Sequence, residues 1–174
     1  MVFMSKTYKG KYKIKKPQKY LGDPSKVTYR SLWERQAFRW CEDQDAVIGW
    51  SSEEVVVPYV CKTDNRPHRY FIDLKVKFAD GRTVLVEIKP KSQTVPPKKP
   101  ARQTKKYISE VMTFIKNESK WEAATKYAKD RGYHFEIWTE DTFITAPPKR
   151  VAEKSKRNFF QGFIFFATIA VLRV

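Results

Sequence analysis

Two strand-like segments joined by Asp80-Gly81 constrain the fold of this 174-residue chain more than any other feature. Apolar and polar side chains alternate over residues 69–78, as they do in a half-buried strand. Asp-Gly is a typical hairpin turn, and the alternation resumes over residues 83–89. The second segment is apolar on both faces until its last three residues, which is typical of a strand covered on both sides. The sequence therefore predicts an antiparallel hairpin with a buried second strand.

The remaining elements place the chain in the α/β class. Ser31 is a good N-cap, and apolar residues recur at helical spacing from there to about Asp43. Residues 55–60 predict a first strand, at a sheet edge because they contain a proline. A second helical pattern begins near Ile108, weakens at residues 117–119 and ends at Gly132, and residues 134–139 then predict a last strand. The predicted order is helix, three strands, helix, strand.

Composition excludes several classes of protein. Hydrophobic residues make up 41% of the chain and aromatic residues 15%, so a folded core is expected. Two cysteines and two histidines are too few for a Cys/His zinc cluster or a disulfide scaffold, and they suit a reducing interior. The first sixteen residues carry charge but no apolar run, which argues against a secretory signal peptide.

The net charge of +16 is concentrated in a few segments. Residues 1–30 hold nine basic residues and one acid, and residues 89–106 hold seven basic residues and no acid. This segregation favours binding to a polyanion, most simply double-stranded DNA, with acidic lipid as the alternative. The residues expected to contact the phosphate backbone are Lys11, Lys13, Lys15, Lys16, Lys19, Arg30, Lys91, Lys98, Lys99, Arg102, Lys105 and Lys106.

Three regions follow from these patterns. Residues 1–28 predict an extended basic arm, residues 29–145 a single folded domain, and residues 146–174 a tail that is first basic and then apolar. The apolar run that starts at Phe159 is shorter than the roughly 20 residues that span a bilayer. A partner-binding or core-packing tail is therefore favoured over a membrane anchor.

Three charged residues near the hairpin are candidates for chemistry. Glu87 and Lys89 are two residues apart on one strand and so project from the same face. Asp73 lies on the polar face of the partner strand, where the three side chains can converge. Carboxylates that bind Mg²⁺ beside a lysine suit phosphodiester hydrolysis, which needs neither histidine nor cysteine. The alternative is that these charges are simply solvated surface groups.

Glu34 is a fourth candidate, with a strong structural alternative. Ser31 to Glu34 has the form of a capping box, in which the Glu34 carboxylate bonds back to the start of the helix. From the residues alone, capping is the favoured role of Glu34.

With Glu34 on a leading helix, Asp73 on one strand and Glu87-Ile88-Lys89 on the next, the chain resembles the PD-(D/E)xK nuclease superfamily, with Ile72-Asp73 in place of the usual Pro-Asp. It is more closely similar to the head completion nucleases of T-even-like tailed phages, and more distantly to the end-cutting endonuclease subunit of some cut-and-paste transposons. The stretches that carry the likeness are YRSLWE, WSSEEVVVPY, RYFIDLKVKFADGRT, VEIKPKSQTVPP and WTED.

The resemblance implies a restriction-endonuclease-like core of order αβββαβ with a mixed central sheet, and a nuclease domain over residues 29–145. It implies that Asp73 and Glu87 bind Mg²⁺, or Mn²⁺ in its place, and that Lys89 positions or activates the attacking water. Glu34 would complete the metal site and Ile88 would offer its backbone carbonyl. No small-molecule cofactor is implied.

The family acts on packaged DNA late in virion assembly, before heads and tails join. That biology implies phage portal or neck proteins as partners, and the cytoplasm of the infected bacterial host or the virion as the location. Endonuclease and exonuclease action are both compatible with these residues. Two alternatives remain: a non-catalytic protein that binds DNA and the portal, and a transposon-type subunit that cuts only with a partner recombinase.

Overall fold

The structure, a computed structural model, describes residues 8–144 and has a four-stranded mixed sheet at its centre. Across the sheet the strands run in the order β3, β6, β7, β8. The β3–β6 and β6–β7 pairs are antiparallel, and the β7–β8 pair is parallel. This confirms an α/β fold with a mixed sheet. The strands of this sheet are β3 (Val47–Ser52), β6 (Leu74–Phe78), β7 (Thr83–Ile88) and β8 (His134–Trp138).

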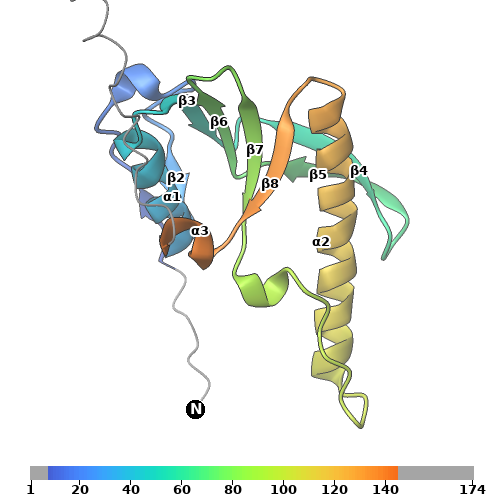
Figure 1. Cartoon of the computed structure of the whole chain (residues 1–174). Helices are drawn as coiled ribbons and strands as arrows, with labels where there is room; N and C mark the ends of the chain where they lie inside the picture. The colour runs from blue at the N-terminus through green and yellow to red at the C-terminus, as the bar shows by residue number, and fades with distance from the viewer. Residues whose placement is uncertain (1–7, 145–174) are drawn as a thin grey trace, which may run out of the picture.

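Helices cover the two faces of this sheet (Figure 1). Helix α1 (Leu32–Asp43) lies on one side and the long helix α2 (Lys105–Lys129) on the other. Strand β7 is buried along its whole length because side chains that alternate in direction enter two separate cores. Val84, Val86 and Ile88 belong to the core on the α1 side, while Leu85 belongs to the core on the α2 side.

The predicted hairpin at Asp80-Gly81 is confirmed. Lys77 of β6 pairs with Thr83 of β7, and the Phe78 N–H donates to the Arg82 carbonyl across the turn at 2.9 Å. Gly81 has a φ of +91°, a conformation that favours glycine.

Two strand predictions need correction. Residues 55–60 do form a strand, β4 (Val56–Cys61), but within residues 8–144 it pairs with β5 (Arg66–Phe71) in a separate two-stranded hairpin and not with the central sheet. Residues 69–78 are not one strand, because Ile72 and Asp73 interrupt the strand between β5 and β6. Ile72 packs in the core on the α2 side, whereas Leu74 packs in the core on the α1 side.

The edge strand β3 of the central sheet was missed. Gly49 interrupts its apolar residues and two serines end it, so no alternating pattern marks the strand. Gly49 has a packing reason: a Cβ there would lie 3.0 Å from the Leu21 side chain. The Leu21 N–H in turn donates to the Trp50 carbonyl at 2.8 Å.

Helix α2 is continuous through residues 117–119, where a weak point was expected. Asn117 and Ser119 are buried polar residues. The Ser119 hydroxyl donates to the Ile115 carbonyl at 2.9 Å and accepts the Lys62 N–H at 3.2 Å. Contact with the β4–β5 hairpin therefore explains polar residues in the middle of this helix. Gly132, with a φ of +68°, follows the end of the helix as predicted.

The described part of the predicted N-terminal arm is packed against the domain. Strand β1 (Gly10–Lys11) pairs with β2 (Thr28–Tyr29), and Tyr12, Tyr20 and Val27 are buried in the core on the α1 side. Glu42 of α1, 1% exposed, accepts hydrogen bonds from the Tyr12 hydroxyl at 2.6 Å and from two backbone N–H groups of the segment. An extended arm was therefore the wrong expectation for residues 8–28.

The remaining elements are short. They are the 3-10 helices η1 (Pro17–Lys19) and η2 (Lys91–Gln93) and the helix α3 (Glu140–Ile144). No helix within residues 8–144 combines the length and apolarity that crossing a membrane requires. The predicted tail over residues 146–174 lies outside the described residues.

Candidate active site

The candidate site lies where the central strand β7 ends. Glu87 is 2% exposed, and both of its carboxylate oxygens are engaged. The Tyr70 hydroxyl donates to Oε2 at 2.5 Å, and Lys89 Nζ lies 3.0 Å from Oε1. A buried carboxylate is stable only with such partners. The structure therefore joins Glu87 and Lys89 in one ion pair, on the face where the sequence placed them.

Asp73 comes next to this pair through the register of the hairpin. Leu74 pairs with Val86, so continuing the register by one residue places Asp73 opposite Glu87. Asp73 Oδ2 accepts the backbone N–H of Ile88 at 2.7 Å. The structure thus brings together Asp73, Glu87 and Lys89.

The negative charges of Asp73 and Glu87 repel each other. Burial and the nearby charge of Glu87 raise the pKa of Asp73 well above its ordinary value, although the hydrogen bond from Ile88 acts in the opposite direction. A pair of close, partly desolvated carboxylates disfavours double ionisation. A bound cation would relieve that repulsion.

Lys89 supplies a positive charge beside the carboxylates. Burial alone would lower the pKa of Lys89, but the charges of Glu87 and Asp73 overcome that effect and raise it above its ordinary value. Lys89 is therefore protonated at neutral pH in this arrangement. In this protonated form Lys89 can act as an electrostatic group and hydrogen-bond donor, and not as a base.

Tyr70 is a site residue that the sequence analysis missed. It lies on β5, which was predicted to be continuous with β6, and its side chain is buried. Burial and the charge of Glu87 raise the pKa of Tyr70, so its hydroxyl remains a donor. The sequence signal, a lone tyrosine three residues before Asp73, is too common to reveal this contact.

Glu34 is engaged as a helix cap. The Ser31 hydroxyl accepts the Glu34 N–H at 3.1 Å and donates to Glu34 Oε1 at 3.0 Å. Oε2 accepts the Arg30 N–H at 2.8 Å, one residue before the Ser31 N–H that a capping box uses. Glu34 is nevertheless near the other acids, because its negative charge contributes to the raised pKa values of Asp73 and Lys89.

The donors at this site fit a divalent cation with oxygen ligands. Asp73 and Glu87 are hard carboxylate donors of the kind that Mg²⁺ prefers, and their mutual repulsion favours a cation between them. Within residues 8–144, Glu34, Asp73 and Glu87 do not form a set of three with oxygens all within 4.8 Å of one another. Glu34 would have to leave its cap to become a ligand, so the fit rests on the other two acids.

The basic residues expected to bind DNA fall into two groups. Lys11, Lys13 and Lys15 are exposed and alternate with the inward-facing Tyr12 and Ile14. The loop over residues 90–104 begins directly after Lys89 and continues into α2, and its predicted DNA-binding residues are exposed, as are Lys105 and Lys106.

The side chains of four of these basic residues have partners within the domain. Lys106 Nζ lies 3.8 Å from Glu110 Oε1 on α2, and the other three make closer contacts. Lys19 Nζ donates to the Gln44 carbonyl at 2.7 Å, which is a structural role. Arg30 forms an ion pair with Glu53 at 2.9 Å, and Lys91 forms one with Asp141 at 2.7 Å. Both of these pairs are largely exposed, so their net stabilisation is small and an anionic ligand can compete for the basic groups.

Comparison with known proteins identifies a family for this chain. Residues 44–140 match the family described as "TnsA-like endonuclease N terminal". This stretch runs from the start of the central sheet to its last strand and contains Asp73, Glu87 and Lys89. The chain belongs to this endonuclease family.

A particular relative narrows the comparison. The chain is 44% identical over 138 residues to the "Head completion nuclease" of Enterobacteria phage T4, which covers 77% of this chain and 92% of the relative. The expected resemblance to both groups of nucleases is confirmed.

Proposed function

We propose that this chain is a Mg²⁺-dependent DNA endonuclease that hydrolyses phosphodiester bonds. The observation that carries the proposal is the convergence of Asp73, Glu87 and Lys89 at the end of β7. Membership of an endonuclease family and the name of the phage T4 relative support it. The proposed fold is the restriction-endonuclease-like core, with the β4–β5 hairpin as an insertion between the first two strands of its sheet.

In this proposal Asp73 and Glu87 hold the Mg²⁺ ion, with the Ile88 carbonyl and Glu34 as further oxygen donors. The ion, when bound, lowers the pKa of a water molecule and offsets negative charge on the phosphate. Lys89 remains protonated and holds the attacking water and phosphate by charge and hydrogen bonding. Tyr70 positions Glu87 through its buried hydroxyl and does not contact substrate.

The proposed DNA surface combines the exposed lysines of the N-terminal segment with the basic loop that follows Lys89. Both contact the phosphate backbone, so affinity should fall with salt and show little dependence on sequence. Mn²⁺ should replace Mg²⁺ because oxygen ligands accept both.

The name of the relative suggests the biological setting. We place the reaction in phage head completion, before heads and tails join, in the infected bacterial host or the virion. Portal or neck proteins are the proposed partners.

The test is incubation of the purified full chain with supercoiled plasmid in Mg²⁺, with an EDTA control. Nicking or linearisation is expected with Mg²⁺ and not with EDTA. Lys89→Ala and Glu87→Gln should lower the rate by about 100-fold or more, because each removes a group that acts on the reacting phosphate or its metal. Lys77→Ala is the matched control, since Lys77 is exposed at the opposite end of the hairpin.

Three outcomes distinguish the alternatives. Unchanged cleavage by Glu87→Gln would refute this active site. DNA binding without cleavage in Mg²⁺ or Mn²⁺ would favour a non-catalytic assembly protein, unless cleavage appears when a partner recombinase is added. End-labelled linear DNA separates the two modes of attack, because an exonuclease releases the label progressively and leaves closed circles intact.

A further inference from the structure

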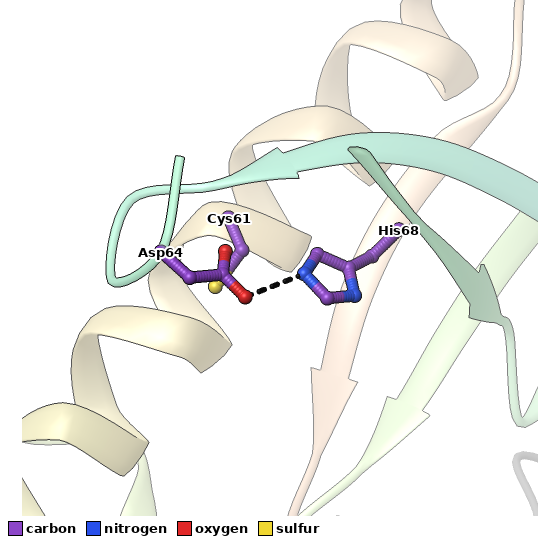
Figure 2. Close-up of side chains that lie close together, drawn as sticks. All are labelled: Cys61, Asp64 and His68. Carbon is purple, nitrogen blue, oxygen red and sulfur yellow. Dashed lines mark hydrogen bonds and ion pairs between the residues drawn. The ribbon is translucent and has the colours of Figure 1, made fainter. Parts of the chain in front are cut away.

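A second group of metal-binding side chains lies at the tip of the β4–β5 hairpin. Cys61 Sγ, an Asp64 carboxylate oxygen and a His68 ring nitrogen all lie within 4.8 Å of one another. Figure 2 shows the Asp64 carboxylate beside the Cys61 sulfur, with a hydrogen bond to the His68 ring. Counting cysteines and histidines in the sequence misses this group, because its third member is an aspartate.

The hairpin register creates the group. His68 pairs with Tyr59, and Cys61 is two residues further along β4. The side chains of His68, Tyr59 and Cys61 therefore lie on one face of the hairpin. The His68 and Tyr59 rings lie 5.6 Å apart at an interplanar angle of 31°, which holds the imidazole in place.

The turn then directs Asp64 toward His68. Asn65 adopts a φ of +57°, and its N–H donates to the Cys61 carbonyl at 2.8 Å. Asp64 Oδ1 accepts the Arg66 N–H at 3.2 Å, while Oδ2 lies 2.9 Å from His68 Nε2. The carboxylate thus has one oxygen fixed by the backbone and one that faces the imidazole and the sulfur.

The hairpin tip is also attached to α2. The Lys62 N–H donates to the Ser119 hydroxyl, and Lys62 Nζ forms an ion pair with Glu122. Cys61 is fully buried as a free thiol, and its sulfur lies 3.0 Å from the Thr63 hydroxyl. The three ligand types are therefore held by the fold around them, as a preorganised site requires.

We propose that Cys61, Asp64 and His68 bind one Zn²⁺ ion. Thiolate, imidazole and carboxylate are the ligand types that Zn²⁺ combines in proteins, and the three ligand atoms, all within 4.8 Å of one another, are close enough to share one ion. The fourth position is left to water or to the Thr63 hydroxyl. The bound ion links β4, the turn and β5 at the hairpin tip, which Lys62 separately attaches to α2.

This site is separate from the candidate active site in place and chemistry. The hairpin runs from the pair Val56–Phe71 to the pair Cys61–Arg66 at its tip, and five residues of strand span about 17 Å. Asp73 follows the far end. A thiolate and an imidazole select a softer ion than the Mg²⁺ proposed for the carboxylates.

Cobalt provides the test, because Co²⁺ bound to a thiolate absorbs light in the near ultraviolet and Zn²⁺ displaces it. Metal-free full chain should develop this band on titration with Co²⁺, saturating at one ion per chain, and lose it when Zn²⁺ is added. Zn²⁺ should also raise the Tm of the chain. Asp64→Asn and His68→Ala should weaken binding by about 10-fold or more. Both residues are exposed, so their loss leaves the fold intact.

Matched variants identify the ligands. Cys61→Ala should abolish the band, whereas Cys41→Ala, which alters the other buried thiol, should keep it. His134→Ala and Glu87→Gln should also keep it, since neither residue is at the hairpin tip. No band from the wild-type chain, or a band that survives Cys61→Ala, would refute the site and leave only an ion pair between Asp64 and His68.

Discussion

Replacing Tyr70 with phenylalanine removes one hydroxyl group from the structure and leaves the ring in place. That hydroxyl is buried and donates to Glu87 Oε2, and Glu87 is 2% exposed. Water cannot replace the lost donor without entering the core. The Glu87 carboxylate would keep its ion pair with Lys89 and lose its hydrogen bond from Tyr70.

The expected cost follows from the kind of hydrogen bond. A hydrogen bond to a charged group contributes about 1.5–3 kcal/mol to stability. Because Tyr70→Phe leaves the buried Glu87 carboxylate without this donor, the free energy of unfolding should fall by an amount in that range. For a domain of this size each 1 kcal/mol lowers the Tm by about 2–4 °C, so the expected decrease is roughly 3–12 °C. Urea denaturation and a thermal melt of metal-free Tyr70→Phe measure both quantities.

Tyr59→Phe is the matched control, because Tyr59 lies in the same core on the neighbouring strand and its ring contacts Tyr70 at a centroid distance of 6.4 Å. That variant should change stability by less than about 0.5 kcal/mol. In a Glu87→Gln background the Tyr70→Phe cost should shrink by about 1 kcal/mol or more, since the two groups act as a pair. Equal costs for the two tyrosine variants would refute the argument.

Two further predictions concern the half-buried Asp73 and the buried Glu42. Asp73 has a higher pKa in the folded chain than its ordinary value, so it favours the fold below about pH 4 and loses that contribution as the pH rises through its raised pKa. The stability of metal-free Asp73→Asn relative to wild type should therefore increase as the pH rises above about 4, as measured by urea denaturation, while nuclease activity is lost. A stability difference between the two proteins that decreases as the pH rises would contradict the assigned charge repulsion. Glu42→Gln should cost about 1.5–3 kcal/mol and speed hydrogen exchange at the Lys15 and Lys16 amides, because it removes the charge that these N–H groups contact. Glu122→Gln, which alters an exposed ion pair, is the control, and equal exchange rates in both variants would show that Glu42 does not hold the segment.

Local patterns determined much of this protein. Alternation and an Asp-Gly turn predicted the β6–β7 hairpin, and an N-cap serine with helical spacing predicted α1, because these signals act between residues close in the chain. The same hairpin register predicted that Asp73 would meet Glu87 and Lys89. Side chains on paired strands have a fixed spacing, so sequence positions alone carry this part of the site.

Tertiary contacts decided the rest. Strand β3 shows no alternating pattern and joins the sheet by pairing with β6, whereas β4 pairs with β5 outside the central sheet. Tyr12 can enter the core because Glu42, thirty residues away, accepts a hydrogen bond from its hydroxyl. Tyr70 contacts Glu87 because β5 ends before Asp73, and Cys61 lies near His68 because β4 pairs with β5. No local sequence pattern shows either feature. Such contacts depend on which surfaces are buried together, and burial is a property of the whole fold.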